Sequence, residues 1–273
     1  MATIAENIQT LRSIKSGIKQ AITDKGGSVG NDFKTYAQAI TNLPSGGGGS
    51  TEIEDALVMR TLSVYSNDRV SMVGYYAFYS YSNLTSVNLP NCASVGKEAF
   101  ASCSTLQSID FPKLSYIGDY AFNNCKKLIS VKLPLCTYIS EGAFIACNFL
   151  PSISLPNCSY IGNNVFQMCS KLSYVNLPLC KEVGRTAFGD CLNLLSINLP
   201  LCTKLSLFTF SNCTKLTQVY LNSVTSVTTI GNNTFSKCSN LTSVYVPASL
   251  VDAFKTAKYW SSISSKIVAY TGA

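Results

Sequence analysis

The stretch that decides the fold reads Leu-Thr-Ser-Val-Asn-Leu-Pro-Asn-Cys-Ala-Ser-Val-Gly-Lys-Glu-Ala-Phe-Ala-Ser-Cys over residues 84–103, and variants of it follow one another along the chain. Its first leucine recurs at steps of 22 residues, with one longer step at the end. The series is Leu84, Leu106, Leu128, Leu150, Leu172, Leu194, Leu216 and Leu241. Because so short a unit cannot bury its own apolar side chains, the copies must stack on one another, and the period predicts a solenoid.

The first half of each unit alternates as a β-strand does. Val87 and Leu89 are expected to point inward, whereas Ser86 and Asn88 point outward. Pro90 ends the strand because proline has no N–H to donate to a ladder.

The second half of each unit carries an Ala-Phe pair, such as Ala99-Phe100, which we place on a short helical turn. The corresponding phenylalanines, from Phe78 to Phe235, are expected to stack into an internal spine. Glycine before the pair fits a turn that requires a positive φ. These glycines are Gly96, Gly118, Gly162, Gly184 and Gly231. The predicted fold class is an α/β solenoid, an arc of 22-residue units that each combine a short strand and a helical turn.

The chain divides into four segments. Residues 1–44 are expected to form a small α-helical module, because apolar residues follow helical spacing over 4–22 and again over 32–40. Residues 45–50 are a Gly/Ser linker, residues 51–248 the solenoid, and residues 249–273 a C-terminal cap. In the cap, Ser249 with Asp252 is expected to open a helix that reaches Trp260, and a strand over 267–270 closes the chain.

The module over 1–44 is too small for an independent core, so its apolar stripe is expected to seek a partner. That partner is either further copies of the module or a larger assembly. The alternative is that the module packs back on the end of the solenoid. The glycine linker argues against rigid packing on the solenoid and favours a separate partner.

Composition excludes several classes of partner. Charged residues make up 13% of the chain, and the net charge of +7 comes from lysines scattered along the repeats. No basic block resembles a nucleic-acid footprint, so no nucleic-acid partner is expected. No apolar run is long enough to span a bilayer, so no membrane insertion is expected. Read as a natural start, Met1 is followed by no export signal.

The 12 cysteines fall on the repeat in two series. The first series is Cys103, Cys125, Cys147, Cys169, Cys191, Cys213 and Cys238, and the second is Cys92, Cys136, Cys158, Cys180 and Cys202. Leu114 and Val224 replace cysteine where a series is interrupted, so the site accepts any apolar group of moderate size. We therefore expect buried, reduced thiols, although disulfides between stacked units are sterically conceivable. The chain has no histidine and no CxxC pair, so no metal site is expected. No cofactor motif and no cluster of catalytic residues is present, and the chain is not expected to be an enzyme.

The repeat Leu-Thr-Ser-Val-Asn-Leu-Pro, followed by Ser-Val-Gly-Lys-Glu-Ala-Phe, resembles the leucine-rich repeats of the BspA-like (Treponema pallidum type) family. The resemblance covers residues 57–248, and the tail from Val246 to Trp260 is similar to the usual ending of such proteins. It implies a surface protein that adheres to host matrix, other bacteria or glycans, and it implies no catalytic residue.

The opening residues resemble a second group of proteins. Ile4-Ala5-Glu6-Asn7-Ile8-Gln9 and Tyr36-Ala37-Gln38-Ala39-Ile40 are similar to an N-terminal module of tail and other virion proteins from gut phages. This resemblance implies an adhesin carried on a virion, which would reach the exterior by lysis.

The outward face of the strands is the expected ligand surface. Tyr174, Tyr220 and Tyr245 interrupt columns of small polar residues and offer aromatic rings to sugars or peptide groups. The remaining candidates are Asn176, Asn198, Lys132 and Asp110. Asp110 and Lys132 lie on adjacent units and are also explained by a cross-strand ion pair. The alternative for the whole face is a plain solvated sheet.

These observations predict a non-enzymatic binding protein with an extended surface for a protein or glycan ligand on a cell surface. Its expected location is the virion or the exterior of the cell. A bacterial surface adhesin with an upstream signal, or a spacer without ligand affinity, are the alternatives.

Overall fold

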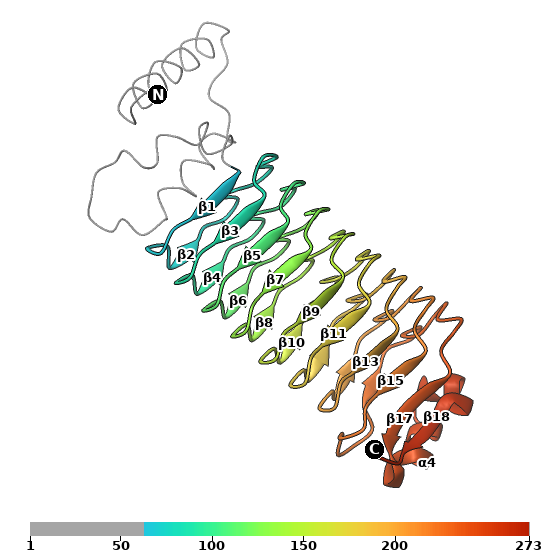
Figure 1. Cartoon of the computed structure of the whole chain (residues 1–273). Coiled ribbons are helices and arrows are strands. Elements are labelled where there is room, and N and C mark those ends of the chain that lie inside the picture. The colour runs from blue at the N-terminus through green and yellow to red at the C-terminus, as the bar shows by residue number, and fades with distance from the viewer. Residues whose placement is uncertain (1–62, 273) are drawn as a thin grey trace, which may run out of the picture.

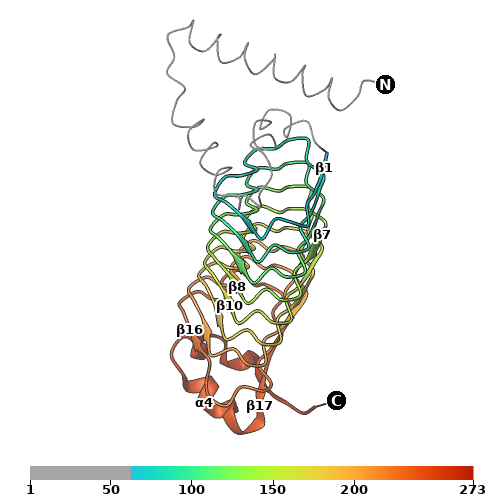
Figure 2. The ribbon, with the colours of Figure 1, turned by 90° about the vertical axis from the view of Figure 1, so that its left-hand side faces the viewer.

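The computed structural model describes residues 63–272, which stack into an elongated ladder of rungs (Figure 1). The expected helical module over 1–44, the linker over 45–50 and the start of the solenoid lie outside the described residues. Each rung has two short strands, and strands of neighbouring rungs pair in parallel, except for one break on the first side. The two sets of strands lie on different sides of the stack (Figure 2).

The longer strands form the first side. They are β1 (Val64–Ser66), β3 (Ser86–Asn88), β5 (Ser108–Asp110), β7 (Ser130–Lys132), β9 (Ser152–Ser154), β11 (Tyr174–Asn176), β13 (Ser196–Asn198), β15 (Gln218–Tyr220), β17 (Ser243–Pro247) and β18 (Ile267–Tyr270). The second side is one eight-stranded sheet. It contains β2 (Met72–Val73), β4 (Ser94–Val95), β6 (Tyr116–Ile117), β8 (Tyr138–Ile139), β10 (Tyr160–Ile161), β12 (Glu182–Val183), β14 (Lys204–Leu205) and β16 (Thr229–Ile230).

The expected inward alternation is confirmed, because Val87 and Leu89 are buried while Asn88 is exposed. The phenylalanine spine is confirmed as well. Successive rings from Phe78 to Phe235 stack nearly parallel with centroids 4.8–5.5 Å apart. This spacing equals the separation of neighbouring strands, so the backbone ladders set the distance between the rings.

The expected helical turn is wrong. The Ala-Phe segments form turns, with no helix between residues 63 and 247, so the repeats are built of strands and turns and the α/β description does not fit them. Backbone hydrogen bonds link these turns from rung to rung, for example from the Phe100 N–H to the Ala121 carbonyl at 2.7 Å. The third side of the stack is thus also a ladder.

The explanation given for the repeated glycines is also wrong. The positive φ values fall two and six residues later, at Glu98 (52°) and Ser102 (61°) and at the equivalent positions of other rungs. Gly118 is needed instead for close approach, since a Cβ there would lie 2.8 Å from the backbone carbon of Gly96 in the preceding rung.

Pro151 divides the first side into two sheets, β1–β7 and β9–β18. At the equivalent positions, the Ile129 N–H donates to the Gln107 carbonyl and the Ser173 N–H donates to the Pro151 carbonyl, each at 2.9 Å. Proline has no such donor, so the ladder is interrupted between β7 and β9.

The C-terminal end is covered by η1 (Ala248–Leu250), α4 (Val251–Thr256), η2 (Trp260–Lys266) and β18. The closing strand is confirmed. The helix is shorter than expected, and its N-cap is Leu250 with no side-chain capping bond, so the predicted cap at Ser249 is wrong. Trp260 is fully buried against Phe235, and its indole Nε1 donates to the Thr228 carbonyl at 2.6 Å. The extra residues near 226–228 thereby hold the cap in place.

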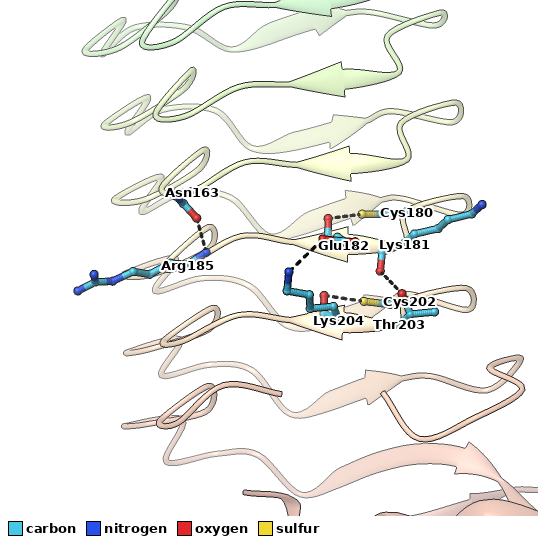
Figure 3. Close-up of polar contacts among 8 residues, drawn as sticks. All are labelled: Asn163, Cys180, Lys181, Glu182, Arg185, Cys202, Thr203 and Lys204. Atoms are coloured by element: carbon cyan, nitrogen blue, oxygen red, sulfur yellow. Dashed lines mark hydrogen bonds and ion pairs between the residues drawn. The ribbon is translucent and has the colours of Figure 1, made fainter. Parts of the chain in front are cut away.

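All twelve cysteines are buried and free, which confirms the expected thiol burial. Those of the first series each donate to the carbonyl of a phenylalanine in the preceding rung, as Cys125 does to Phe100 at 3.2 Å. Those of the second series donate to the backbone two residues on, as Cys180 does to Glu182 and Cys202 to Lys204 (Figure 3). Burial raises the pKa of the Cys103 and Cys158 thiols to about 12.

Candidate functional site

The outward face of the first side carries the residues predicted to bind a ligand, and the structure divides them into two groups. Tyr220 of β15 and Tyr245 of β17 are in register and stack with their ring centroids 4.7 Å apart. Tyr174 lies on β11, two strands away from β15. It belongs to the neighbouring column, where the adjacent rungs carry Ser152 and Ser196. Tyr174 therefore does not join the other two.

Tyr270 of β18 completes the first group and was not predicted. Its ring stands edge-on to Tyr220 and to Tyr245, with both centroid distances 6.3 Å. It reaches this position because β18 adds a strand beside β17 that pairs Tyr270 with Pro247. The 22-residue period could not reveal it, since β18 belongs to the cap.

We define Tyr220, Tyr245 and Tyr270 as the tyrosine cluster, and hydrogen bonds fix the orientation of its first two members. The Tyr220 hydroxyl donates to Gln218 Oε1 at 3.0 Å, and Gln218 Nε2 donates to the Tyr245 hydroxyl at 3.3 Å. Partial burial, followed by the effect of the two neighbouring tyrosines, raises the pKa of Tyr220. The cluster thus presents hydroxyl groups and partly covered rings, which suits contact with sugar rings or peptide groups.

Tyr174 belongs to a different environment. Its side chain is 60% exposed, and Leu195, Ile129 and Phe149 on nearby rungs are also more than half exposed. This part of the surface surrounds the interruption of the ladder at Pro151. Exposed apolar side chains gathered on a surface otherwise rich in serine, threonine and asparagine are typical of an interaction site.

The predicted polar candidates are paired with residues of neighbouring strands. Lys132 Nζ lies 3.2 Å from Asp110 Oδ2, which confirms the cross-strand ion pair, and both side chains are well exposed. Such an exposed pair stabilises the fold by a fraction of a kcal/mol at most. Asn176 Nδ2 donates to Ser154 Oγ at 3.0 Å, and Asn198 is in register with Asn176 and Tyr220. Asn198 therefore continues the polar column directly to the tyrosine cluster.

The second side carries a ladder of tyrosines that was not predicted. Tyr116, Tyr138 and Tyr160 occupy one outward column, with ring centroids 5.6 and 4.6 Å apart. The column continues with Glu182 and Lys204, whose charged atoms lie 3.3 Å apart (Figure 3). The repeat spacing alone could have found this ladder, since the three tyrosines are 22 residues apart.

The described residues offer little for covalent chemistry. Between residues 63 and 272 no group of three or more metal-ligating side chains is gathered. The sulfur atoms are buried, and burial raises the pKa of each thiol, for example that of Cys202 to about 12, so they are held in the unreactive protonated form. In the same part of the chain, no helix has the length and apolar character needed to cross a bilayer.

Comparison with known proteins points to one family. The profile of the BspA type leucine rich repeat region, which has six copies, matches residues 71–194 and 159–268. No curated protein matches the chain.

Among solved structures, the chain is similar to the leucine-rich repeat protein of T. pallidum, with 28% identity and a TM-score of 0.58 over 69% of this chain and 88% of that one. It is more distantly similar to a leucine-rich repeat protein from Bacteroides ovatus, at 20% identity and a TM-score of 0.32 over 78% of this chain and 85% of that one. A leucine rich cell surface protein from Faecalibacterium prausnitzii gives 18% identity and a TM-score of 0.32, over 78% and 83%.

Proposed function

Because the chain belongs to the BspA-type leucine-rich repeat family, whose matched region covers most of its length, we propose that it is a non-enzymatic binding protein that adheres to a ligand on a cell surface. The ligand is a protein or a glycan, and it contacts the outward face of β11–β18. The observation that carries this proposal is the tyrosine cluster at the end of that face. A plain solvated sheet does not need two stacked tyrosines bridged by one glutamine, with a third tyrosine edge-on to both.

The cluster is suited to binding because its side chains are ordered before a ligand arrives. Tyr220 stacks on Tyr245, and Gln218 is hydrogen-bonded to both. These contacts restrict the rotamers of Tyr220, Tyr245 and Gln218. Ordering a free side chain on binding costs about 0.5–1.5 kcal/mol, and this cost is largely avoided here. The polar columns that lead to the cluster extend the contact surface along the stack.

The experiment that tests the proposal is binding of the full chain to immobilised fibronectin, collagen and an array of defined oligosaccharides. The variant Tyr220→Asn/Tyr245→Asn takes the residue that the same column carries at Asn176 and Asn198, so it preserves the strands. We expect a loss of about tenfold or more in affinity, since aromatic anchors of this kind contribute about 1–2 kcal/mol each.

The matched control is Tyr116→Ser, which removes a tyrosine from the opposite side and takes the residue of Ser94 in the same column. It should leave the affinity unchanged. Equal losses in both variants, or no binding of the parent chain to any probe, would contradict the proposal.

A second candidate follows from residues 1–44, whose stretches over 4–9 and 36–40 resemble an N-terminal module of virion proteins from gut phages. In this case the module places the solenoid in a larger assembly, and the adhesin is carried on a phage particle. Light scattering after size exclusion distinguishes the cases. The full chain should form an oligomer, whereas a chain that begins at Thr51 should be a monomer. A monomer in both measurements would remove the candidate.

A further inference from the structure

The corner where the turns of the third side lead into the strands of the first side carries a row of lysines. Lys127, Lys171 and Lys215 each stand directly before the leucine that opens a unit, and Lys126 adds a fourth side chain. All four are exposed. We call these four residues the lysine edge.

Hydrogen bonds link neighbouring rungs along the lysine edge. The Phe149 N–H donates to the Lys126 carbonyl at 3.3 Å, and the Lys171 N–H donates to the Asn148 carbonyl at 3.2 Å. Lys215 Nζ donates to Asn193 Oδ1 of the preceding rung at 2.8 Å, so side chains of this column reach one another. Lys127, Lys171 and Lys215 are two rungs apart, which places their backbones about 10 Å apart.

The lysine edge has no acidic residue beside it in the repeat. Along the described repeats, the two positions before each opening leucine hold no acidic residue from Ser82–Asn83 through to Ser239–Asn240. Among residues 63–272, none of the four lysines takes part in a salt bridge. The Asp190 carboxylate accepts a hydrogen bond from Asn212 Nδ2 at 2.6 Å. Within this part of the chain, the lysine edge is therefore a strip of positive potential in which no lysine is paired with a carboxylate.

An aromatic ring stands inside this strip. Phe149 occupies the rung between Lys127 and Lys171 in the same column, and its side chain is 58% exposed. Other rungs place Asn83, Thr105 or lysine at this position, so the repeat does not require an apolar residue there. An exposed ring between two cations is suited to a ligand that combines anionic groups with an apolar C–H face.

We propose that the lysine edge binds a linear anionic polysaccharide, one that carries a carboxylate or sulfate group on every second sugar. The acid groups of such a chain recur over a length close to the two-rung separation of the lysines. The sugar between two acid groups then lies over Phe149. In a β-strand the side chains of one face recur every two residues, about 6.6 Å, and would not keep step with lysines about 10 Å apart. This surface is separate from the tyrosine cluster, so the inference does not depend on the ligand of that cluster.

The experiment measures binding of the full chain to chondroitin sulfate and hyaluronan oligosaccharides over a range of salt concentrations, with dextran as the neutral polymer. The variant Lys127→Thr/Lys171→Asn takes the residues of Thr105 and Asn193 in the same column. We expect its affinity at low salt to fall about tenfold and the salt dependence to become shallower by about two counterions.

The matched control is Lys181→Thr/Arg185→Asn. It changes the net charge equally, and it takes the residues of Thr203 and Asn163 in the same columns. Both side chains extend away from the stack on other sides of the rung (Figure 3). The control should stay within twofold of the parent chain. A third variant, Phe149→Asn, should weaken binding without changing the salt dependence.

Three results would overturn the inference. The parent chain fails to bind either anionic oligosaccharide, the control loses as much affinity as the lysine variant, or single-stranded oligothymidine binds the edge as tightly as the polysaccharides do. None of these results bears on the Tyr220→Asn/Tyr245→Asn variant. The function proposed for the tyrosine cluster can therefore stand or fail independently of the lysine edge.

Discussion

Raising the pH to 9.5 should destabilise the fold strongly. At this pH the twelve thiols ionise in the unfolded chain, whereas burial keeps them protonated in the folded chain. Burial raises the pKa of Cys92 and Cys238 to about 11 and that of Cys136 and Cys169 to about 12. An unfolded thiol ionises near pH 8.5. The unfolded state therefore binds fewer protons than the folded state above this pH, and the free energy of unfolding falls as the pH rises towards the folded pKa values.

The size of the effect follows from the same values. At pH 9.5 an unfolded thiol with a pKa of about 8.5 gains about 1.4 kcal/mol from ionisation, a gain that a folded thiol with a pKa near 12 does not share. Folded domains are stable by only about 5–15 kcal/mol. Twelve such thiols together are enough to unfold the solenoid.

The assay is urea unfolding followed by far-UV circular dichroism at pH 7.5 and at pH 9.5, with a phosphine reductant present throughout. A Cys169→Ala/Cys191→Ala variant should be less stable at pH 7.5 but should lose about 3 kcal/mol less than the parent chain between the two pH values. A free energy of unfolding that stays constant up to pH 9.5 would refute thiol burial as we describe it.

Four further changes test individual features by urea unfolding. Phe166→Ala should lower the free energy of unfolding by about 3–5 kcal/mol because it removes a fully buried ring from the spine, and a loss below about 1 kcal/mol would show that the rings do not stack. Gly118→Ala should cost about 1–3 kcal/mol, since its Cβ meets the backbone of the preceding rung, and a neutral result would remove the close-approach explanation. Trp260→Phe should cost about 1–3 kcal/mol, because the Thr228 carbonyl loses its donor, and a cap that still melts together with the repeats at unchanged stability would contradict this. Tyr138→Ser should cost less than about 1 kcal/mol per stacked neighbour, and a larger loss would indicate that the tyrosine ladder is part of the core.

The sequence predicted the features that repeat. The inward position of Val87, the stacked rings and the burial of the cysteines all follow from one period, because a residue that recurs at each rung has the same environment at each rung. The ion pair between Asp110 and Lys132 could be predicted for the same reason.

The features that failed depend on details that the period does not contain. Whether the Ala-Phe segment is a helical turn or a β-like turn depends on two positive φ angles per rung, and residues as varied as Glu98, Tyr120 and Thr186 adopt them. The role of Gly118 depends on the distance between rungs, which is set by the backbone ladders. Tyr270 joins the candidate site only because the cap returns a strand beside β17, and a contact of this kind has no sequence signature.

Deletion of one internal rung tests the central claim most directly. Removal of residues 145–166 joins Phe144 to Gln167 and leaves every remaining residue in its place in the repeat. Since each rung contacts only its neighbours, the shortened chain should fold, unfold cooperatively in urea and show a free energy of unfolding reduced by the contribution of one rung. A shortened chain that lacks the β-sheet circular dichroism of the parent chain, or that unfolds without a cooperative transition, would contradict the account of equivalent stacked rungs.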